Sequence, residues 1–302
     1  MIYTVTFNPT LDYTVRLSRL ELGKVNRTEE ETLYPGGKGI NVSLVLHHLG
    51  LDTVAMGFAA GFTGRELLHR LKDAGCREDF LMIPGVSRIN VKIKEQQETD
   101  INGQGPVIPK EALEQLIQKL ERSLHSGDVL VLAGSIPDSL PNDVYQQILK
   151  RLDGREVRTV VDATGSLLTN VLIYRPFLIK PNHHELGEIF GKELHTPEEV
   201  VSYARKLQEQ GARNVLVSMA GDGAVLLDEA GRVHHSPAPT GKVVNAVGAG
   251  DSMVAGFLYG YLTTKDYEKA FYWGLCAGSA TAFHSGLATR ADIEELANVF
   301  IK

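Results

Sequence analysis

Short apolar runs rich in β-branched residues alternate with longer amphipathic segments along most of the chain. Runs of this kind predict strands at Ile2–Phe7, Thr53–Met56, Val129–Leu132, Thr159–Val161, Phe177–Ile179 and Val215–Val217. Segments with helical periodicity follow or separate them, at Gly39–His48, Gly64–Ala74, Pro109–His125, Pro141–Leu152, Pro197–Gln210, Ala249–Leu262, Lys265–Ser285 and Ala291–Ile301. Apolar strands alternating with helices predict a three-layer α/β/α domain with a mostly parallel central sheet.

Two stretches break this rhythm. Asp12–Tyr34 and Arg88–Gly103 alternate polar and β-prone residues, and neither contains a helical pattern. We interpret them as hairpins that leave the main sheet and form a small β-sheet lid. The expected main domain then comprises residues 1–11, 35–85 and 104–302, and the expected lid comprises residues 12–34 and 86–103.

Composition and charge narrow the class of protein. With 302 residues, 43% apolar and 23% charged, the chain can bury a large core. The net charge of -6 is spread along the sequence, so we expect no nucleic-acid partner. No apolar run reaches the ~20 residues of a membrane helix, and the first residues lack a secretion signal, so we expect no membrane partner. Cys76 and Cys276 form no CxxC motif, which favours a reduced, cytoplasmic location.

The stretch Val247–Ser252 carries the strongest chemical signal. Glycines 248 and 250 flank Ala249 just where an apolar helix begins, and Asp251 follows. Free amides and the positive end of the helix dipole make such a start an anion site, and an adjacent carboxylate could take a proton from an attacking hydroxyl. This pairing points to phosphoryl transfer. A Gly-rich turn with an ordinary acidic residue in the first helical turn is the alternative.

A second Gly-rich turn, Tyr34–Asn41, also opens a helix. Ligands of open α/β sheets bind at the carboxyl ends of the strands, so both turns could face one cleft, one for each reactant. Neither turn is a Walker A loop, because no Gly-Lys pair is followed by Ser or Thr, and the dinucleotide fingerprint also fails. The paired histidines, such as His183 and His184, lack the spacing of a zinc site.

Asn182 and Glu185 follow a predicted strand and share one helix face. They could orient the waters of a magnesium ion on ATP, or Asn182 could simply cap the helix while Glu185 is solvated. Lys38, Arg88 and Asn90 could likewise be ordinary polar residues of the lid. A sugar-phosphate dianion, however, needs cations of this kind.

Taken together, the motifs resemble the ribokinase/PfkB family of sugar kinases over essentially the whole chain. The motifs that carry the resemblance are Asn8-Pro9-x-x-Asp12, PGGKGINVS, RINVKI, LAGSIP, IKPNxxE, VSMAGDGA and VGAGDSMVAGF. Lys38, the run Asp100–Gly103 and the ending GLATR are similar to the branch of 1-phosphofructokinases and tagatose-6-phosphate kinases. The resemblance therefore implies a ribokinase-like fold and an enzyme that uses ATP and Mg²⁺.

The resemblance also implies roles for individual residues. Asp251 would be the catalytic base, with an anion hole formed by the amides of Gly248, Ala249 and Gly250. The substrate would be bound by Asp12, Gly36, Gly37, Lys38, Asn41, Arg88, Asn90 and Ser135, with Lys24 and Arg27 as additions from the lid. The nucleotide and its magnesium would be bound by Lys180, Asn182, Glu185, Ser218, Gly221, Gly223 and Ser279, and Glu185 would hold the metal through water.

The implied reaction is the phosphorylation of fructose 1-phosphate at its 6-hydroxyl by ATP. Tagatose 6-phosphate is the alternative substrate, because a pseudo-symmetric ketohexofuranose can present either end to Asp251. A sugar-phosphate sensor without activity is a remote second class, since the base, both glycines and the NxxE pair are all retained. The resemblance and the open edges of the lid strands also imply a homodimer joined through the lid.

Overall fold

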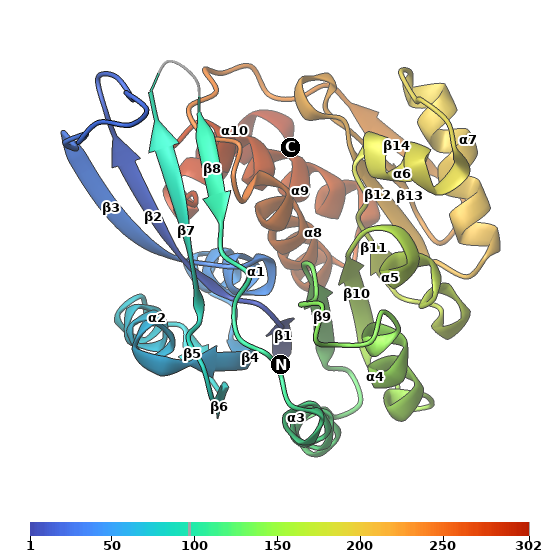
Figure 1. Cartoon of the computed structure of the whole chain (residues 1–302). Coiled ribbons are helices and arrows are strands. Elements are labelled where there is room, and N and C mark those ends of the chain that lie inside the picture. Colours follow the sequence, from blue (N-terminus) through green and yellow to red (C-terminus); the bar gives the residue numbers. More distant parts are fainter. Residues whose placement is uncertain (96–97, 302) are drawn as a thin grey trace.

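The computed structural model describes residues 1–95 and 98–301 and contains one large and one small sheet (Figure 1). The large sheet has the order β14-β13-β12-β11-β10-β9-β1-β4-β5, and β6 also pairs with β4. Its strands are β1 (Ile2–Thr6), β4 (Thr53–Ala60), β5 (Arg77–Glu78), β6 (Leu81–Ile83), β9 (Val129–Ala133), β10 (Arg158–Asp162), β11 (Leu178–Ile179), β12 (Asn214–Ser218), β13 (Ala224–Leu227) and β14 (Val233–Ser236). The pairs from β12 to β5 are parallel, and β13 and β14 extend one edge antiparallel. The predicted mostly parallel sheet is confirmed.

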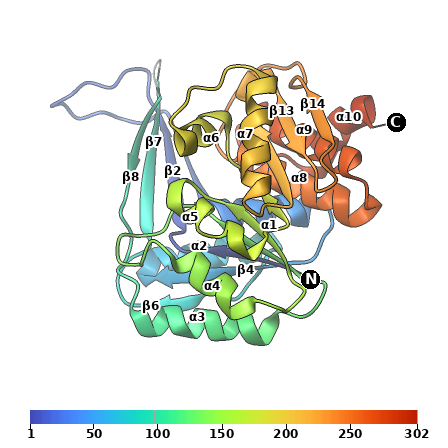
Figure 2. The ribbon, with the colours of Figure 1, turned by 90° about the vertical axis from the view of Figure 1, so that its right-hand side faces the viewer.

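Helices cover both faces of this sheet. One layer consists of α1 (Lys38–His48), α2 (Gly61–Asp73), α8 (Ala249–Thr264), α9 (Tyr267–Ala282) and α10 (Arg290–Phe300). The other consists of α3 (Lys110–Ser123), α4 (Val144–Leu152), α5 (Gly165–Thr169), α6 (His183–Phe190) and α7 (Pro197–Glu209), of which α4, α5 and α7 lie nearest the viewer in Figure 2. The three-layer prediction is therefore confirmed. Within the described residues, no helix has the length and apolarity that crossing a membrane requires.

The strand β9 shows why the central strands are apolar throughout. Val129 and Val131 pack into the core beneath α1 and α8, whereas Leu130 and Leu132 pack into the opposite core beneath α3 and α4. All four side chains are at most 1% exposed. Because both faces of the strand are buried, the alternation expected of a half-exposed strand is absent, as in other parallel sheets.

The small sheet stands apart from the helical layers, at the left of Figure 1, and has the order β3-β2-β7-β8. Its strands are β2 (Thr10–Arg16), β3 (Glu30–Gly36), β7 (Arg88–Lys94) and β8 (Thr99–Asn102). β2 and β3 form one antiparallel pair, β7 and β8 form another, and β2 joins β7 in parallel. The second, smaller sheet is thus confirmed, while its treatment as a separate lid domain with the stated boundaries stays a proposal.

Several short elements have no counterpart in the predictions. They are β5, β6, β13, β14 and α5, each five residues or fewer. β14 contains His234 and His235, and its side chains do not show an apolar run; its position comes from pairing with β13. The helix predicted at Lys265–Ser285 begins only at Tyr267, because Lys265 is left-handed and the side chain of Asp266 caps the amides of residues 268 and 269.

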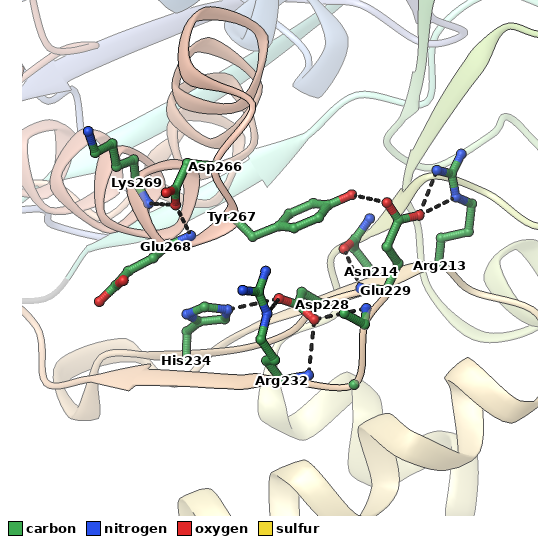
Figure 3. Close-up of polar contacts among 12 residues, drawn as sticks. Arg213, Asn214, Asp228, Glu229, Arg232, His234, Asp266, Tyr267, Glu268 and Lys269 are labelled. Carbon is green, nitrogen blue, oxygen red and sulfur yellow. Dashed lines mark hydrogen bonds and ion pairs between the residues drawn. The ribbon is translucent and has the colours of Figure 1, made fainter.

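A network of polar side chains surrounds the turn from β13 to β14 (Figure 3). Asp228 is fully buried, and its carboxylate accepts hydrogen bonds from the amides of Ala230 (2.9 Å) and Arg232 (3.0 Å) and from Arg232 Nε (2.8 Å). His234 Nε2 lies 3.1 Å from Oδ2 of Asp228, the oxygen that Arg232 Nε also contacts. Glu229 contacts Tyr267 and Arg213 in the same network. These contacts join the last strands of the sheet to the start of α9.

Candidate active site

A cavity of about 1100 Å³ opens at the carboxyl ends of the parallel strands, beside the small sheet. Most of the predicted site residues line it: Asp12, Gly37, Lys38, Asn41, Arg88, Asn90, Ser135, Lys180, Asn182, Glu185, Ser218, Gly221, Gly223, Gly248, Ala249, Gly250, Asp251 and Ser279. They come from both sheets and from four helices. Their placement in one cavity fits the predicted cleft, and their individual roles remain proposals.

The start of α8 forms the middle of the cavity. Gly248 caps this helix in a left-handed conformation (φ 82°), and a Cβ atom there would lie 2.7 Å from the side chain of Leu287. The amide of Ala249 donates to the carbonyl of Ala246 (3.2 Å), so it is engaged within the turn. Of the predicted anion hole, the amides of Gly248 and Gly250 therefore remain as the candidates for binding a phosphoryl group.

Asp251 lies in the first turn of α8 and is 6% exposed. Its Oδ2 atom accepts a hydrogen bond from Nδ2 of Asn41 at 2.7 Å. Burial, together with the negative charge of Asp162, raises the pKa of Asp251 to about 6, against the opposing effects of Lys38, Asn41 and Lys180. A carboxylate with such a pKa is a stronger base than an ordinary Asp and is still ionised at neutral pH.

Asp162 is a buried residue of the site that the sequence analysis missed. It ends β10, and its Oδ1 lies 3.0 Å from the ammonium of Lys38 and 3.5 Å from that of Lys180. Burial opposes ionisation of Asp162, but the two lysines outweigh it and lower the pKa of this carboxyl. Burial also opposes the charge on Lys38, yet Asp162 and Asp251 raise the pKa of Lys38. Asp162 and Lys38 are therefore both charged at neutral pH.

The signal that could have identified Asp162 is its position. It directly follows the predicted strand Thr159–Val161, just as Lys180 follows the predicted strand Phe177–Ile179. Polar residues at the carboxyl ends of neighbouring parallel strands meet at the same edge of the sheet.

The small sheet contributes the other side of the cavity. Asp12 on β2 and Asn90 on β7 are direct neighbours, and Nδ2 of Asn90 donates to Oδ1 of Asp12 at 3.0 Å. Burial raises the pKa of Asp12, although Lys92 and Asn90 oppose that effect. The Nε atom of Arg88 donates to the carbonyl of Asn8 at 3.0 Å, which fixes the direction of the guanidinium. This wall therefore offers a carboxylate, an amide and a cation.

Three predicted substrate residues do not line the cavity. Gly36 is buried behind Asp12, and a Cβ atom at this position would lie 2.5 Å from Oδ2 of Asp12, so the glycine makes room for that carboxylate. Lys24 and Arg27 are exposed on the segment between β2 and β3. Lys24 forms an ion pair with Glu21 there. Within one chain, the structure does not bring these two cations to the cavity.

Asn182 and Glu185 form a reciprocal cap at the start of α6. Oδ1 of Asn182 accepts from the amide of Glu185, and Oε2 of Glu185 accepts from the amide of Asn182, both at 2.8 Å. The prediction that Asn182 caps this helix is thus confirmed. Glu185 takes part in the same cap and also lines the cavity. Its Oε1 atom is not part of the cap.

This arrangement was tested for its fit to Mg²⁺. Among residues 1–95 and 98–301, no three His, Cys, Asp or Glu side chains gather into a set that could hold a metal ion. Mg²⁺ commonly keeps several waters and takes one or two carboxylates plus substrate phosphates, so a single carboxylate in this cavity is compatible with it. Glu185 would supply that carboxylate, through water.

The nucleotide-side residues surround the turn after β12. Ser218 ends this strand, and Gly221 and Gly223 belong to the turn that follows. Gly223 has a φ of 92°, and a Cβ atom there would lie 2.0 Å from the carbonyl oxygen of Ser236, so only glycine fits. Ser279 reaches the cavity from α9. The cavity is also lined by His183 and His184, which the sequence analysis treated as incidental.

Proteins with related sequences have matching lengths. A 1-phosphofructokinase from Bacillus subtilis is 47% identical over 98% of this chain and 97% of its own length. A D-tagatose-1-phosphate kinase from Bacillus licheniformis is 36% identical over 99% of this chain and 98% of its own length.

A solved structure and a family profile agree with this similarity. The crystal structure of a candidate phosphofructokinase from Staphylococcus aureus superposes with a TM-score of 0.87 and 41% identity, and covers 99% of this chain and 97% of its own. The profile of the pfkB family of carbohydrate kinases matches residues 5–294. The predicted family is thereby confirmed, and the chain belongs to the pfkB family of carbohydrate kinases.

Proposed function

We propose that this enzyme transfers the γ-phosphoryl group of ATP to the 6-hydroxyl of fructose 1-phosphate, giving fructose 1,6-bisphosphate and ADP. The observation that carries the proposal is Asp251, a buried carboxylate at the start of α8. It lies in a cavity with two different walls. The wall on the small sheet carries groups suited to a sugar phosphate, and the opposite wall contains the Gly-rich turn after β12. The name of the Bacillus subtilis relative supports the choice of sugar phosphate.

In the proposed reaction, the Asp251 carboxylate accepts the proton of the 6-hydroxyl. The hydroxyl oxygen forms a bond to the γ-phosphorus, while the bond from that phosphorus to the oxygen retained by ADP breaks. The amides of Gly248 and Gly250 and the ammonium of Lys180 would stabilise the negative charge on the transferred group. Placement and charge stabilisation supply most of the rate enhancement in reactions of this kind.

The phosphate on C1 of the sugar is assigned to Arg88, Asn90 and Ser135. Nε of Arg88 is held by the carbonyl of Asn8, and its terminal nitrogens make no hydrogen bond within the described part of the chain. They are therefore free to bind a phosphate in a bidentate manner. The ion pair of Lys38 with Asp162 directs its ammonium toward Asp251 instead. We accordingly assign Lys38 to the transferred phosphoryl group.

ATP is assigned to the wall formed by Lys180, Ser218, Gly221, Gly223 and Ser279. Mg²⁺, when bound, would neutralise charge on the ATP phosphates. Glu185, oriented by its cap with Asn182, would hold the metal through water, since the carboxylate lines the cavity and Mg²⁺ keeps most of its waters.

Tagatose 1-phosphate is a second candidate substrate, because the Bacillus licheniformis relative is named for it. It carries its phosphate on C1 and offers a 6-hydroxyl, as fructose 1-phosphate does, so the same mechanism applies. The alternative from the sequence, tagatose 6-phosphate, would require the sugar to bind in the reverse direction and remains a prediction.

The test is coupled ADP release with ATP and Mg²⁺, comparing kcat/KM for fructose 1-phosphate, tagatose 1-phosphate, tagatose 6-phosphate, fructose 6-phosphate and fructose. We expect the highest value for fructose 1-phosphate. A preference for either tagatose phosphate would keep the mechanism and change the substrate. Absence of turnover with all five would favour the sensor hypothesis.

We also propose that the chain forms a homodimer through the small sheet. The outer face of that sheet carries Leu11, Tyr13 and Ile89, which line an apolar hollow together with Phe62 of α2. Phe62 is 65% exposed and Ile89 is 41% exposed, and β3 and β8 leave open edges. An apolar face of this kind beside open edges fits a second copy of the chain.

Light scattering on the eluting protein tests the dimer, with an expected mass of twice 33.0 kDa. Ile89→Asp should shift the protein toward the monomer. Ile173→Asp, at an exposed position outside the small sheet, is the matched control. A monomeric wild-type protein would contradict the proposal. The cytoplasmic location stays a prediction.

A further inference from the structure

We propose that Asp162 is a positioning residue for phosphoryl transfer, which holds the ammonium groups of Lys38 and Lys180 beside Asp251 and Gly250. The inference rests on the proposed kinase function. Asp162 does not line the cavity, whereas both lysines do, so it acts through them and touches neither substrate. Its side chain is 1% exposed.

The three charged groups come from separate parts of the chain. Lys38 begins α1, Asp162 ends β10, and Lys180 follows β11. Oδ1 of Asp162 lies 3.0 Å from Nζ of Lys38 and 3.5 Å from Nζ of Lys180. One oxygen atom therefore fixes two ammonium groups, and each would otherwise be free to turn toward another anion.

Lys180 is the more constrained of the two lysines. Its side chain is 4% exposed, and its Nζ would lie 3.2 Å from a Cβ atom built on Gly250. The ammonium thus lies against the helix start where the transferred phosphoryl is expected. Because a buried ammonium needs a counter-ion, Asp162 both fixes the place of this group and supplies its partner charge.

The second oxygen of Asp162 has a different environment. Oδ2 is buried and has no hydrogen-bond partner among the described residues. The main chain of Asp162 is fixed separately, since its carbonyl accepts from the amide of Gly134 at 2.9 Å, next to Ser135 in the cavity. A structural carboxylate would use both oxygens. The negative charge of Asp162 is therefore balanced by the two lysines on Oδ1 and by no further hydrogen bond to Oδ2 among the described residues.

That charge also influences the base. The charged groups that act on Asp251 are Asp162 from β10, Lys38 from α1 and Lys180 from the segment after β11, and Glu185 of α6 acts on Lys38. Burial is the largest cause that raises the pKa of Asp251, and the negative charge of Asp162 is the second. Lys38 and Lys180 both lower the pKa of Asp251. Removing the charge of Asp162 should therefore lower the pKa of Asp251 and make it a weaker base.

The experiment compares wild type, Asp162→Asn and Asp162→Glu by pH profiles of kcat and by KM for fructose 1-phosphate. For Asp162→Asn we expect kcat to fall on the order of 10²-fold and the acidic limb of the profile to move to lower pH, with KM nearly unchanged. Asp162→Glu keeps the charge but displaces it, so it should keep the limb and lower kcat. Asp228→Asn, another buried carboxylate outside the cavity, is the matched control and should change neither quantity.

Three outcomes would overturn the inference: an unmoved acidic limb in Asp162→Asn, wild-type kcat in Asp162→Glu, or additive losses on combining Asp162→Asn with Lys180→Met. If Asp162 acts through Lys180, the double variant should be little worse than Lys180→Met alone. If Asp162→Asn does not fold, as judged by circular dichroism, Asp162→Glu decides. A wild-type protein without turnover would instead refute the proposed function.

Discussion

Two of the buried carboxylates, Asp162 and Asp228, lie at opposite edges of the large sheet and have different kinds of partners. Asp228 receives its hydrogen bonds from Ala230, Arg232 and His234, all within six residues along the chain, and both of its oxygens are used (Figure 3). Asp162 uses one oxygen for two lysines, of which Lys38 is 124 residues away. Its other oxygen has no partner in the described part of the chain.

This difference separates a structural carboxylate from one suited to a reaction. The partners of Asp228 form a closed set around a turn, so this network stabilises the fold and offers nothing to a ligand. The partners of Asp162, Lys38 and Lys180, line the cavity, where we propose that they bind the transferred phosphate. Incomplete bonding costs free energy, and such costs are commonly found at functional sites.

The largest expected effect is that of Asp251→Asn. The variant keeps the size of the side chain and can still contact Asn41, but it cannot accept the proton of the 6-hydroxyl. We expect kcat to fall by ~10²-fold or more while fructose 1-phosphate still binds. Turnover and calorimetric binding measure the two properties separately. Near-normal turnover would show that Asp251 is not the base.

The pH dependence should also distinguish Asp251 in the cavity from Asp228 in the polar network at the turn from β13 to β14. Asp251 has a pKa of about 6, so its protonation should reduce kcat about tenfold for each pH unit well below 6. Burial opposes the charge of Asp228, but the contacts from His234 and Arg232 lower its pKa. Its stabilising contribution is present above the ordinary pKa of Asp and is lost only as the pH falls through that lowered pKa.

Activity should therefore fall to about a tenth near pH 5 in a protein that is still folded. Initial rates and circular dichroism from pH 4.5 to 8 test this expectation, with the protein returned to pH 7.5 to confirm recovery. Rates that stay constant down to pH 5 would refute the elevated pKa of Asp251. Unfolding in parallel with the loss of rate would remove the distinction between Asp251, which affects activity, and Asp228, which affects stability.

Local patterns in the sequence were enough to predict the layers and the helix start at Gly248–Asp251, whereas most other cavity residues came from the resemblance to the family. The strand at Val129–Leu132 is readable because both of its faces are buried, and Gly248 and Gly250 are readable because they precede a helix and an acid. These signals are local. A local sequence pattern predicts the structure correctly when the burial or turn that it reflects depends on only a few neighbouring residues.

The ion pairs of Asp162 could not be predicted in the same way. Lys180 meets it because β10 and β11 are parallel neighbours, and Lys38 meets it because α1 packs against β9, the other neighbour of β10, which no local pattern specifies. The strands β13 and β14 were missed for the same reason, since each has four residues and is defined by its pairing. Exposed Lys24 and Arg27 were expected as additions from the lid, yet within one chain they do not line the cavity.

A smaller effect on the reaction is expected from Glu185→Gln at the start of α6. This variant separates the capping role of Glu185 from its proposed role in holding Mg²⁺. Gln can replace Glu in a reciprocal cap, so the helix start and the melting temperature should be preserved. The loss of charge should raise the Mg²⁺ concentration for half-maximal rate several-fold, on the order of 10-fold for the loss of an outer-shell partner. A magnesium titration of the initial rate measures it. An unchanged titration would show that Glu185 serves only as a cap.

The smallest effect on catalysis is expected from Asp228→Asn. The amide can accept from Arg232 through its oxygen, but its NH₂ group faces other donors, so buried hydrogen bonds are lost. We expect the free energy of unfolding to fall by about 1–3 kcal/mol while kcat stays at the wild-type value. Urea unfolding and initial rates test the two parts. A fall in kcat with stability preserved would mean that the network around Asp228 is coupled to the cavity, through the packed helices α8 and α9. The contrast between a structural carboxylate and a reactive one would then fail.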